Sequence, residues 1–171
     1  MLNRRQILMS ALALGAAAAL PAPARAGLSA PTGKVLLTAR GKITQTNADG
    51  AALFDMDMLE KLPSRLARVK TPWTEGIVEF QGPLGSALLD TVGATGDTLR
   101  FTALNDYSVE IPAAEFRAMP IILATRMNGK PMPVREKGPL FVIYPFDLDP
   151  ALYNESVFNR SIWQVKSLEI V

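Results

Sequence analysis

Two short motifs in the sequence combine residue types that can bind ligands. Asp147, Asp149 and Glu155 lie close together, as the carboxylates of a calcium-binding loop do. The other oxygen ligands and the central glycine of such a loop are missing. The Gly-Pro-Leu-Gly run at 82–85 lacks the following lysine of a phosphate-binding loop. We therefore interpret the carboxylates as solvated loop residues and the glycine run as a turn into a helix.

Two residue types that carry much enzyme chemistry are absent. The 171-residue chain contains no Cys and no His. Without Cys there is no disulfide, thiolate nucleophile, iron–sulfur cluster or thiolate-bound metal. Without His there is no Ser-His-Asp triad, zinc-protease helix or haem imidazole. The composition therefore excludes most hydrolases and metalloenzymes.

Strand patterns dominate the chain after residue 26. Short runs rich in β-branched and aromatic residues alternate with Gly, Pro, Asn and Asp. They predict strands at 35–39, 77–80, 98–103, 107–111, 121–124, 140–144 and 163–170. Helices are predicted at 55–62, 86–92 and 113–119, and Asn105 and Asp106 supply a hairpin turn. The predicted fold class is α+β, mainly antiparallel β, in one domain over residues 27–171.

Several motifs follow one another from residue 73 onward. They are Trp-Thr-Glu-Gly-Ile at 73–77 before Leu-Leu at 88–89, Phe-Thr-Ala at 101–103 with Asn-Asp-Tyr at 105–107 and Ile-Pro at 111–112, Leu-Ala-Thr-Arg-Met-Asn-Gly-Lys-Pro-Met-Pro at 123–133, Gly-Pro-Leu-Phe-Val-Ile-Tyr-Pro at 138–145, and Arg-Ser-Ile-Trp at 160–163. Their order resembles the molybdopterin-binding domain of the sulfite oxidase family. The run at 123–133 matches that family's Leu-Ala-x-x-Met-Asn-Gly-x-Pro-Leu-Pro pattern almost residue for residue. The resemblance covers most of residues 27–171 and implies the sulfite oxidase-like fold.

The sequence departs from this family where the metal is held. The family has a molybdenum-ligating Cys before the position of Trp73, whereas residues 66–72 form a shortened segment without sulfur. Lys137 stands where the family has a His before Gly-Pro, and Phe141 stands where a strand has Arg. A molybdenum centre held in the usual way is therefore not expected, and no metal-binding or catalytic residue is predicted.

The resemblance still implies a pocket for a pterin ring. A flat bicyclic ring needs aromatic faces and a few fixed polar groups around its edge. The candidate faces are Trp73, Tyr107, Tyr144 and Trp163. The candidate polar groups are Asn105, Asp106, Arg126, Arg135, Lys137 and Arg160. The alternative is that each Trp is a core or rim aromatic and that the basic residues are solvated.

The first 26 residues have the pattern of an export signal. Arg4 and Arg5 precede an apolar stretch at 7–20, and Ala24-Arg25-Ala26 offers a cleavage site. The arginine pair predicts twin-arginine export to the periplasm, with the general secretory route and an uncleaved anchor as alternatives. Removing the three arginines of this segment from the 18 basic residues leaves 15 against 16 acidic residues. That net charge of −1 argues against a nucleic-acid partner.

The predicted function depends on the resemblance alone. Small exported relatives without the cysteine look like regulators that bind a pterin and dock on the periplasmic domain of an inner-membrane signalling protein. We therefore predict a regulator, not an enzyme, that binds a reduced pterin of the tetrahydropterin type without molybdenum. Its partner would be a cyclic di-GMP enzyme or a sensor kinase, with biofilm formation as an output. The alternatives are a molybdopterin-dependent oxidoreductase or its accessory subunit, and a scaffold in an electron-transfer complex.

Overall fold

The computed structural model describes residues 27–171. The predicted export signal, with Arg4 and Arg5, lies outside the described residues. Within residues 27–171 no helix is both long enough and apolar enough to span a bilayer.

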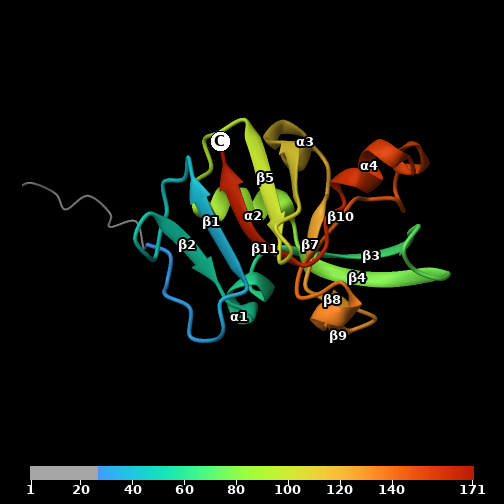
Figure 1. Cartoon of the computed structure of the whole chain (residues 1–171), viewed down its shortest axis with the longest axis horizontal. Coiled ribbons are helices and arrows are strands. Elements are labelled where there is room, and N and C mark those ends of the chain that lie inside the picture. Colours follow the sequence, from blue (N-terminus) through green and yellow to red (C-terminus); the bar gives the residue numbers. More distant parts are fainter. Residues whose placement is uncertain (1–26) are drawn as a thin grey trace, which may run out of the picture.

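The larger sheet has five strands in the order β2-β1-β11-β5-β6. Its strands are β1 (Leu37–Gly41), β2 (Ala51–Phe54), β5 (Thr98–Ala103), β6 (Ser108–Pro112) and β11 (Val165–Ile170). Neighbouring strands pair antiparallel except β1 and β11, which are parallel. Figure 1 shows these two strands side by side, so the last strand of the chain lies next to the first.

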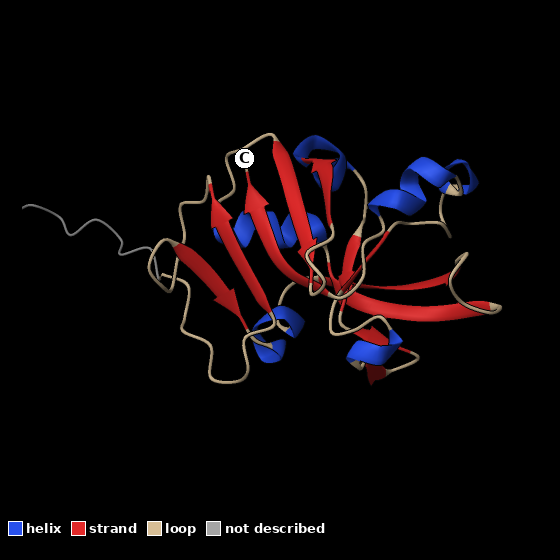
Figure 2. Ribbon diagram, viewed as in Figure 1, coloured by secondary structure: helices blue, strands red, loops and turns tan. Residues whose placement is uncertain are grey.

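Alternation along β5 shows why this sheet has one buried and one open face. Leu99, Phe101 and Ala103 are buried against the core, while the residues between them are partly exposed. On the open face the Arg100 guanidinium donates to Glu110 on β6 at 2.9 Å and to Glu169 on β11 at 2.6 Å. A sheet with a period of two between apolar and polar residues needs cover on one side only. That cover is the helix α2 (Gly85–Val92), labelled in Figure 1 and seen behind the sheet in Figure 2.

Two smaller sheets form the other half of the structure. The strands are β3 (Ser64–Lys70), β4 (Ile77–Pro83), β8 (Arg126–Met127) and β9 (Lys130–Pro131) in one sheet, and β7 (Ile122–Ala124) paired with β10 (Phe141–Ile143) in the other. β3 and β4 form a long two-stranded arm that projects from the molecule (Figure 1). Gly82 in β4 allows close approach to β7, because a Cβ there would lie 2.2 Å from the Leu123 carbonyl oxygen. The arm is thereby anchored to the core.

Short helices connect these sheets. They are α1 (Met56–Glu60), α2 (Gly85–Val92), α3 (Ala113–Ala118) and α4 (Glu155–Arg160), with the 3-10 turns η1 (Val134–Glu136) and η2 (Pro150–Leu152). Asp55 caps α1: its carboxylate accepts from the Met58 amide at 2.9 Å and from the amides of Thr32 and Gly33, both at 2.7 Å. Hydrogen bonds from Gly33 and Met58 are the main reason that the pKa of Asp55 lies below its usual value. This buried carboxylate therefore ties the segment before β1 to the start of α1.

The predicted fold class is confirmed: the domain is α+β with mostly antiparallel strands. Every predicted strand and helix is present, with ends shifted by a few residues, and the hairpin at Asn105 and Asp106 joins β5 to β6. The sequence patterns missed β2, β3, β8, β9 and α4. β3 was not predicted because only two of its side chains, Ala67 and Val69, are buried. It is stabilised instead by pairing with β4 along its whole length. The segment 66–72, predicted to be shortened and without a sulfur ligand, is therefore largely this strand.

Candidate functional site

A pocket of about 310 Å³ opens where α4, the β5–β6 turn and the β3–β4 loop meet. Residues from all three segments line it: Trp73, Ala103, Asn105, Tyr107, Phe158, Asn159, Ser161, Ile162 and Trp163. This volume lies at the lower end of the range for small-molecule sites, about 300–1,000 Å³.

Trp73 forms one wall of the pocket from the loop between β3 and β4. The Thr71 and Thr74 hydroxyls are 2.7 Å apart, and the Trp73 amide donates to the Thr71 hydroxyl at 3.3 Å. Thr71 is itself buried. These bonds hold the loop in one conformation, so the half-buried indole is fixed without a charged partner.

Trp163, just before β11, forms the adjoining wall and packs edge-on against Trp73. Its ring centroid lies 5.7 Å from that of Trp73, with 64° between the planes. Behind both indoles lies buried Phe141, with centroids 5.6 Å from Trp73 and 6.0 Å from Trp163. Because the indole planes are inclined, a flat ligand ring can stack on one indole and meet the other edge-on.

The polar part of the lining is neutral. It consists of the Asn105 and Asn159 amides and the Tyr107 and Ser161 hydroxyls. The Asn105 side-chain oxygen Oδ1 accepts from the Tyr107 backbone amide at 3.2 Å. The Ser161 hydroxyl donates to the Val157 backbone carbonyl at 3.0 Å. Amide side chains both donate and accept. They therefore suit the edge of a heterocycle in which donors and acceptors alternate.

Four of the predicted site residues line this pocket together: Trp73, Asn105, Tyr107 and Trp163. Lys137 lies beside it, with Nζ 5.6 Å from the centroid of the Trp163 ring. That distance fits a cation–π contact. The remaining predicted residues are not in the lining, and each has another partner.

Tyr144 and Arg160 meet at Glu115 instead of facing the pocket. The buried Tyr144 hydroxyl donates to Glu115 Oε1 at 2.6 Å, and the Arg160 guanidinium donates to Oε2 at 2.5 Å. Burial, and then the Glu115 carboxylate, raise the pKa of Tyr144. The expectation that Tyr144 offers an open aromatic face is therefore wrong. Arg160 thereby holds α4 against α3, and α4 carries the pocket residues Phe158 and Asn159.

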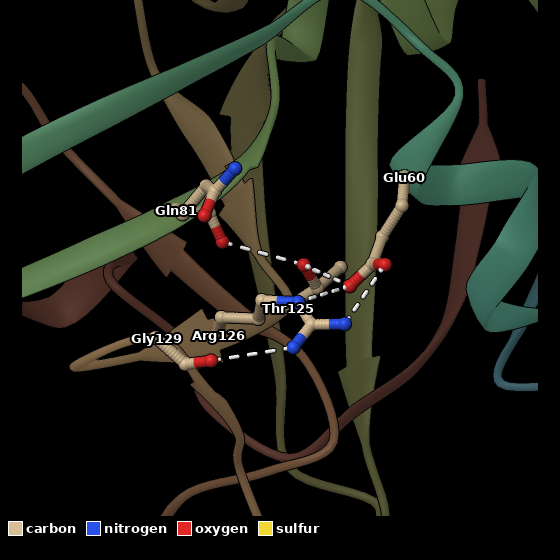
Figure 3. A network of polar contacts seen from close by, with 5 residues as sticks. All are labelled: Glu60, Gln81, Thr125, Arg126 and Gly129. Atoms are coloured by element: carbon tan, nitrogen blue, oxygen red, sulfur yellow. Dashed lines mark hydrogen bonds and ion pairs between the residues drawn. The ribbon is translucent and has the colours of Figure 1, made fainter.

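Arg126 belongs to a different network, shown in Figure 3. Its Nε and Nη2 atoms donate to the two Glu60 carboxylate oxygens at 2.7 and 3.0 Å, and Nη1 donates to the Gly129 carbonyl at 3.3 Å. The hydrogen bond with Glu60 raises the pKa of Arg126. The guanidinium thus joins β8 to α1 and lies outside the pocket lining.

Asp106 and Arg135 also lie outside the lining. Asp106 adopts a left-handed turn conformation (φ 66°) and pairs with Lys166. The Arg135 side chain is 84% exposed, and its nearest carboxylate, Glu136, is 3.6 Å away. A solvated role therefore describes Arg135 better than a cofactor contact.

The sequence patterns missed the contribution of α4. Phe158 packs edge-on against Trp73 at 5.7 Å, and Asn159 adds an amide to the lining. A usable signal was present, since Asn154 caps this helix by accepting from the Val157 amide at 3.1 Å. An Asn followed at once by an acidic residue is typical of a helix start.

The donor set of the chain suits an organic ring better than a metal. Residues 27–171 contain no group of three or more His, Cys, Asp or Glu side chains able to hold a metal ion. The whole sequence lacks a thiolate. The pocket residues therefore fit a pterin ring but supply no sulfur ligand for molybdenum.

Comparison with known proteins identifies the family. Residues 56–147 match the family described as the oxidoreductase molybdopterin binding domain. Among solved structures the chain is similar to the sulfane dehydrogenase SoxCD from Paracoccus pantotrophus, with a TM-score of 0.58 and 19% identity over 78% of this chain and 37% of that one. The chain thus spans well under half of that protein chain, and the likeness shows a shared fold. No curated protein matches the sequence significantly.

These matches confirm the resemblance to the sulfite oxidase family and correct one prediction. The prediction that the protein is not an enzyme is wrong, because the matching domain is an oxidoreductase domain and the structure with the same fold is that of a dehydrogenase. The cofactor of this family is molybdopterin, which is of the pterin type. The chain belongs to the oxidoreductase molybdopterin-binding domain family.

Proposed function

We propose that the pocket lined by Trp73 and Trp163 binds a reduced pterin of the tetrahydropterin type. The observation that carries this proposal is the pair of inclined indoles above a lining whose polar groups are all neutral. Stacking on an indole supplies affinity for any flat bicyclic ring, and the Asn105 and Asn159 amides supply selectivity for an edge of alternating donors and acceptors.

Intrinsic fluorescence gives a direct test, because the chain has only two tryptophans and both line the pocket. Anaerobic titration with a tetrahydropterin should quench both indoles with one saturable transition. A purine nucleoside of similar size is the matched control and should bind more weakly. Quenching that rises linearly with concentration, or equal affinity for the purine, would contradict a pterin site.

We further propose that the bound pterin is not anchored through molybdenum. The support is chemical: a metal in this pocket would have to be held by the cofactor's own sulfur and by oxygen, since the chain offers no thiolate. Protein purified from its native host should contain a pterin with molybdenum well below one equivalent. One equivalent of molybdenum would overturn this proposal and leave pterin binding intact.

The pterin-bound protein could work in either of two settings, an oxidoreductase system or a signalling system, and we propose both. As a component of an oxidoreductase system, the protein would hold the cofactor for redox chemistry, and its family membership supports this setting. As a periplasmic regulator, it would pass pterin occupancy to the periplasmic domain of an inner-membrane signalling protein. The missing thiolate is compatible with the second setting, because occupancy can be signalled without a metal.

A genetic experiment separates the two settings. Deleting the gene should alter a membrane-signalling output such as biofilm formation only in cells that have the signalling partner. An equal effect in cells without any such partner would contradict the regulator. Loss of a redox activity, restored by adding the purified protein loaded with its cofactor, would support the oxidoreductase setting.

A further inference from the structure

A second hollow of about 310 Å³ lies on the other side of the segment that follows Trp163. It is lined by Lys34, Val35, Leu36, Thr38, Leu104, Val134, Pro139, Lys166 and Ser167. We call this set the β1–β11 groove, since Thr38 of β1 and Ser167 of β11 are paired in its floor. None of its residues contributes to the pocket described above.

The groove walls are apolar side chains that remain open to solvent. Val35, Leu104 and Val134 are 39%, 44% and 50% exposed. They stand together around one hollow, whereas isolated exposed apolar residues are common on any protein surface. The groove can therefore accept an apolar side chain without rearranging the core.

The charges of the groove have one sign. Lys34 and Lys166 are its only ionisable lining residues. Lys166 also pairs with Asp106, whose side chain is 84% exposed, whereas no ion pair is seen for Lys34 within residues 27–171. Apolar walls beside two ammonium groups are complementary to an apolar side chain flanked by a carboxylate.

Gln164 joins the groove to the pocket. Its side-chain amide donates to the Val134 carbonyl at 2.7 Å, and its carbonyl accepts from the Leu104 amide at 2.9 Å. Gln164 directly follows Trp163, and Leu104 directly precedes Asn105. The hydrogen bond between Gln164 and Leu104 therefore joins the chain neighbours of two pocket residues, Trp163 and Asn105. Gln164 adopts a left-handed conformation (φ 54°) that non-glycine residues rarely adopt, and such residues concentrate at functional sites.

We infer that the β1–β11 groove docks an extended segment of a partner protein, one that presents an apolar side chain next to a carboxylate. Ligand in the pocket changes the affinity of the groove through Gln164; this coupling rests on the pterin binding proposed above. Docking itself needs only the groove, because its walls and charges are present without ligand. The free energy of coupling is reciprocal, so the segment must change pterin affinity by the same factor.

The docking test uses short fluorescein-labelled peptides with the folded protein. A peptide of alternating Leu and Glu should bind saturably, while alternating Leu and Lys or Ser and Glu should not. Lys34→Glu should weaken the Leu–Glu peptide at least tenfold. The matched control is Lys130→Glu, which makes the same charge change on exposed β9 and should leave binding unchanged. Equal loss in both variants, equal binding of all peptides, or binding only to anionic phospholipid vesicles would overturn the docking site.

The coupling test uses Gln164→Gly, because glycine keeps the left-handed backbone and removes only the side-chain hydrogen bond to Val134. In the unchanged protein a saturating tetrahydropterin should alter peptide affinity at least threefold, and Gln164→Gly should abolish that change while both ligands still bind. An unaltered peptide affinity in the unchanged protein would overturn the coupling. Peptide binding without any tetrahydropterin binding would leave the groove standing and refute the proposed pterin site.

Discussion

The indole rings of Trp73 and Trp163 pack edge-on, with 5.7 Å between their centroids, although ninety positions separate the residues in the chain. One comes from a loop held by threonine hydroxyls, and the other lies two residues before the last strand, β11. Trp163 is 38% exposed, whereas Trp73 is partly covered by Phe158. The two indoles therefore differ in how much of each face is open to a ligand.

Trp163→Ala should weaken tetrahydropterin binding by roughly 1–3 kcal/mol, the range for loss of an aromatic that stacks on a nucleobase. That is about fivefold to 150-fold in Kd. Trp163→Phe should lose less, because a smaller face remains. Titrations followed by the fluorescence of the remaining Trp73 measure both effects. Unchanged affinity in folded Trp163→Ala would remove this residue from the site.

Glu115→Gln should loosen α4 and thereby lower pterin affinity without touching the ligand. It removes the charge that Arg160 and Tyr144 share and should cost about 1.5–3 kcal/mol of stability, as for hydrogen bonds to charged groups. Hydrogen exchange at residues 155–160 should become faster. The control is Arg117→Gln, which lies on the same α3 helix and breaks an exposed ion pair with Asp90 of α2. Unchanged exchange in α4 would contradict this positioning role.

Arg126→Met should destabilise the protein and leave pterin affinity unchanged. The guanidinium is about one-third exposed and joins Glu60 to the Gly129 carbonyl, so we expect a loss of about 1 kcal/mol. Arg135→Met, at a side chain that is 84% exposed, is the control and should change neither quantity. Thermal unfolding and the fluorescence titration measure the two effects separately. Weaker pterin binding in folded Arg126→Met would return this residue to the site.

Protonation of Asp55 should lower the free energy of unfolding in acid. Its pKa in the folded protein is lowered from 3.8, so its contribution is full above that value and is lost as pH falls through the lower folded pKa. Asp55→Asn lacks the contribution at neutral pH, and the stability gap between the two proteins should close in acid. Urea unfolding from about pH 7 to about pH 2 measures the gap. The control is Asp57→Asn, at an exposed residue of the same helix. The difference in unfolding free energy between this variant and the unchanged protein should stay small at every pH.

Changing Arg4 and Arg5 together to Lys should stop export if the twin-arginine route is used, because that translocase reads the guanidinium pair and not charge alone. Cell fractionation should then find the precursor in the cytoplasm. Normal export of the double variant would favour the general secretory route.

Local patterns in the sequence determined much of the fold and the chemical class of the site. The period of two along 98–103 is a property of neighbouring residues, and so is the turn chemistry of Asn105 and Asp106. The missing thiolate is a matter of composition and needs no coordinates. Motif order was enough to indicate the family, because the motifs are contiguous segments.

Only the tertiary structure decided which candidates share the pocket. Tyr144 and Trp163 are both aromatic residues of matching motifs, yet Tyr144 is buried against Glu115, twenty-nine positions earlier in the chain, while Trp163 stays open. The Arg126 guanidinium is likewise paired with Glu60, sixty-six positions away, and lies outside the pocket lining. A local pattern carries no information about partners at such separations, because packing between distant elements fixes both burial and the pairing of charges.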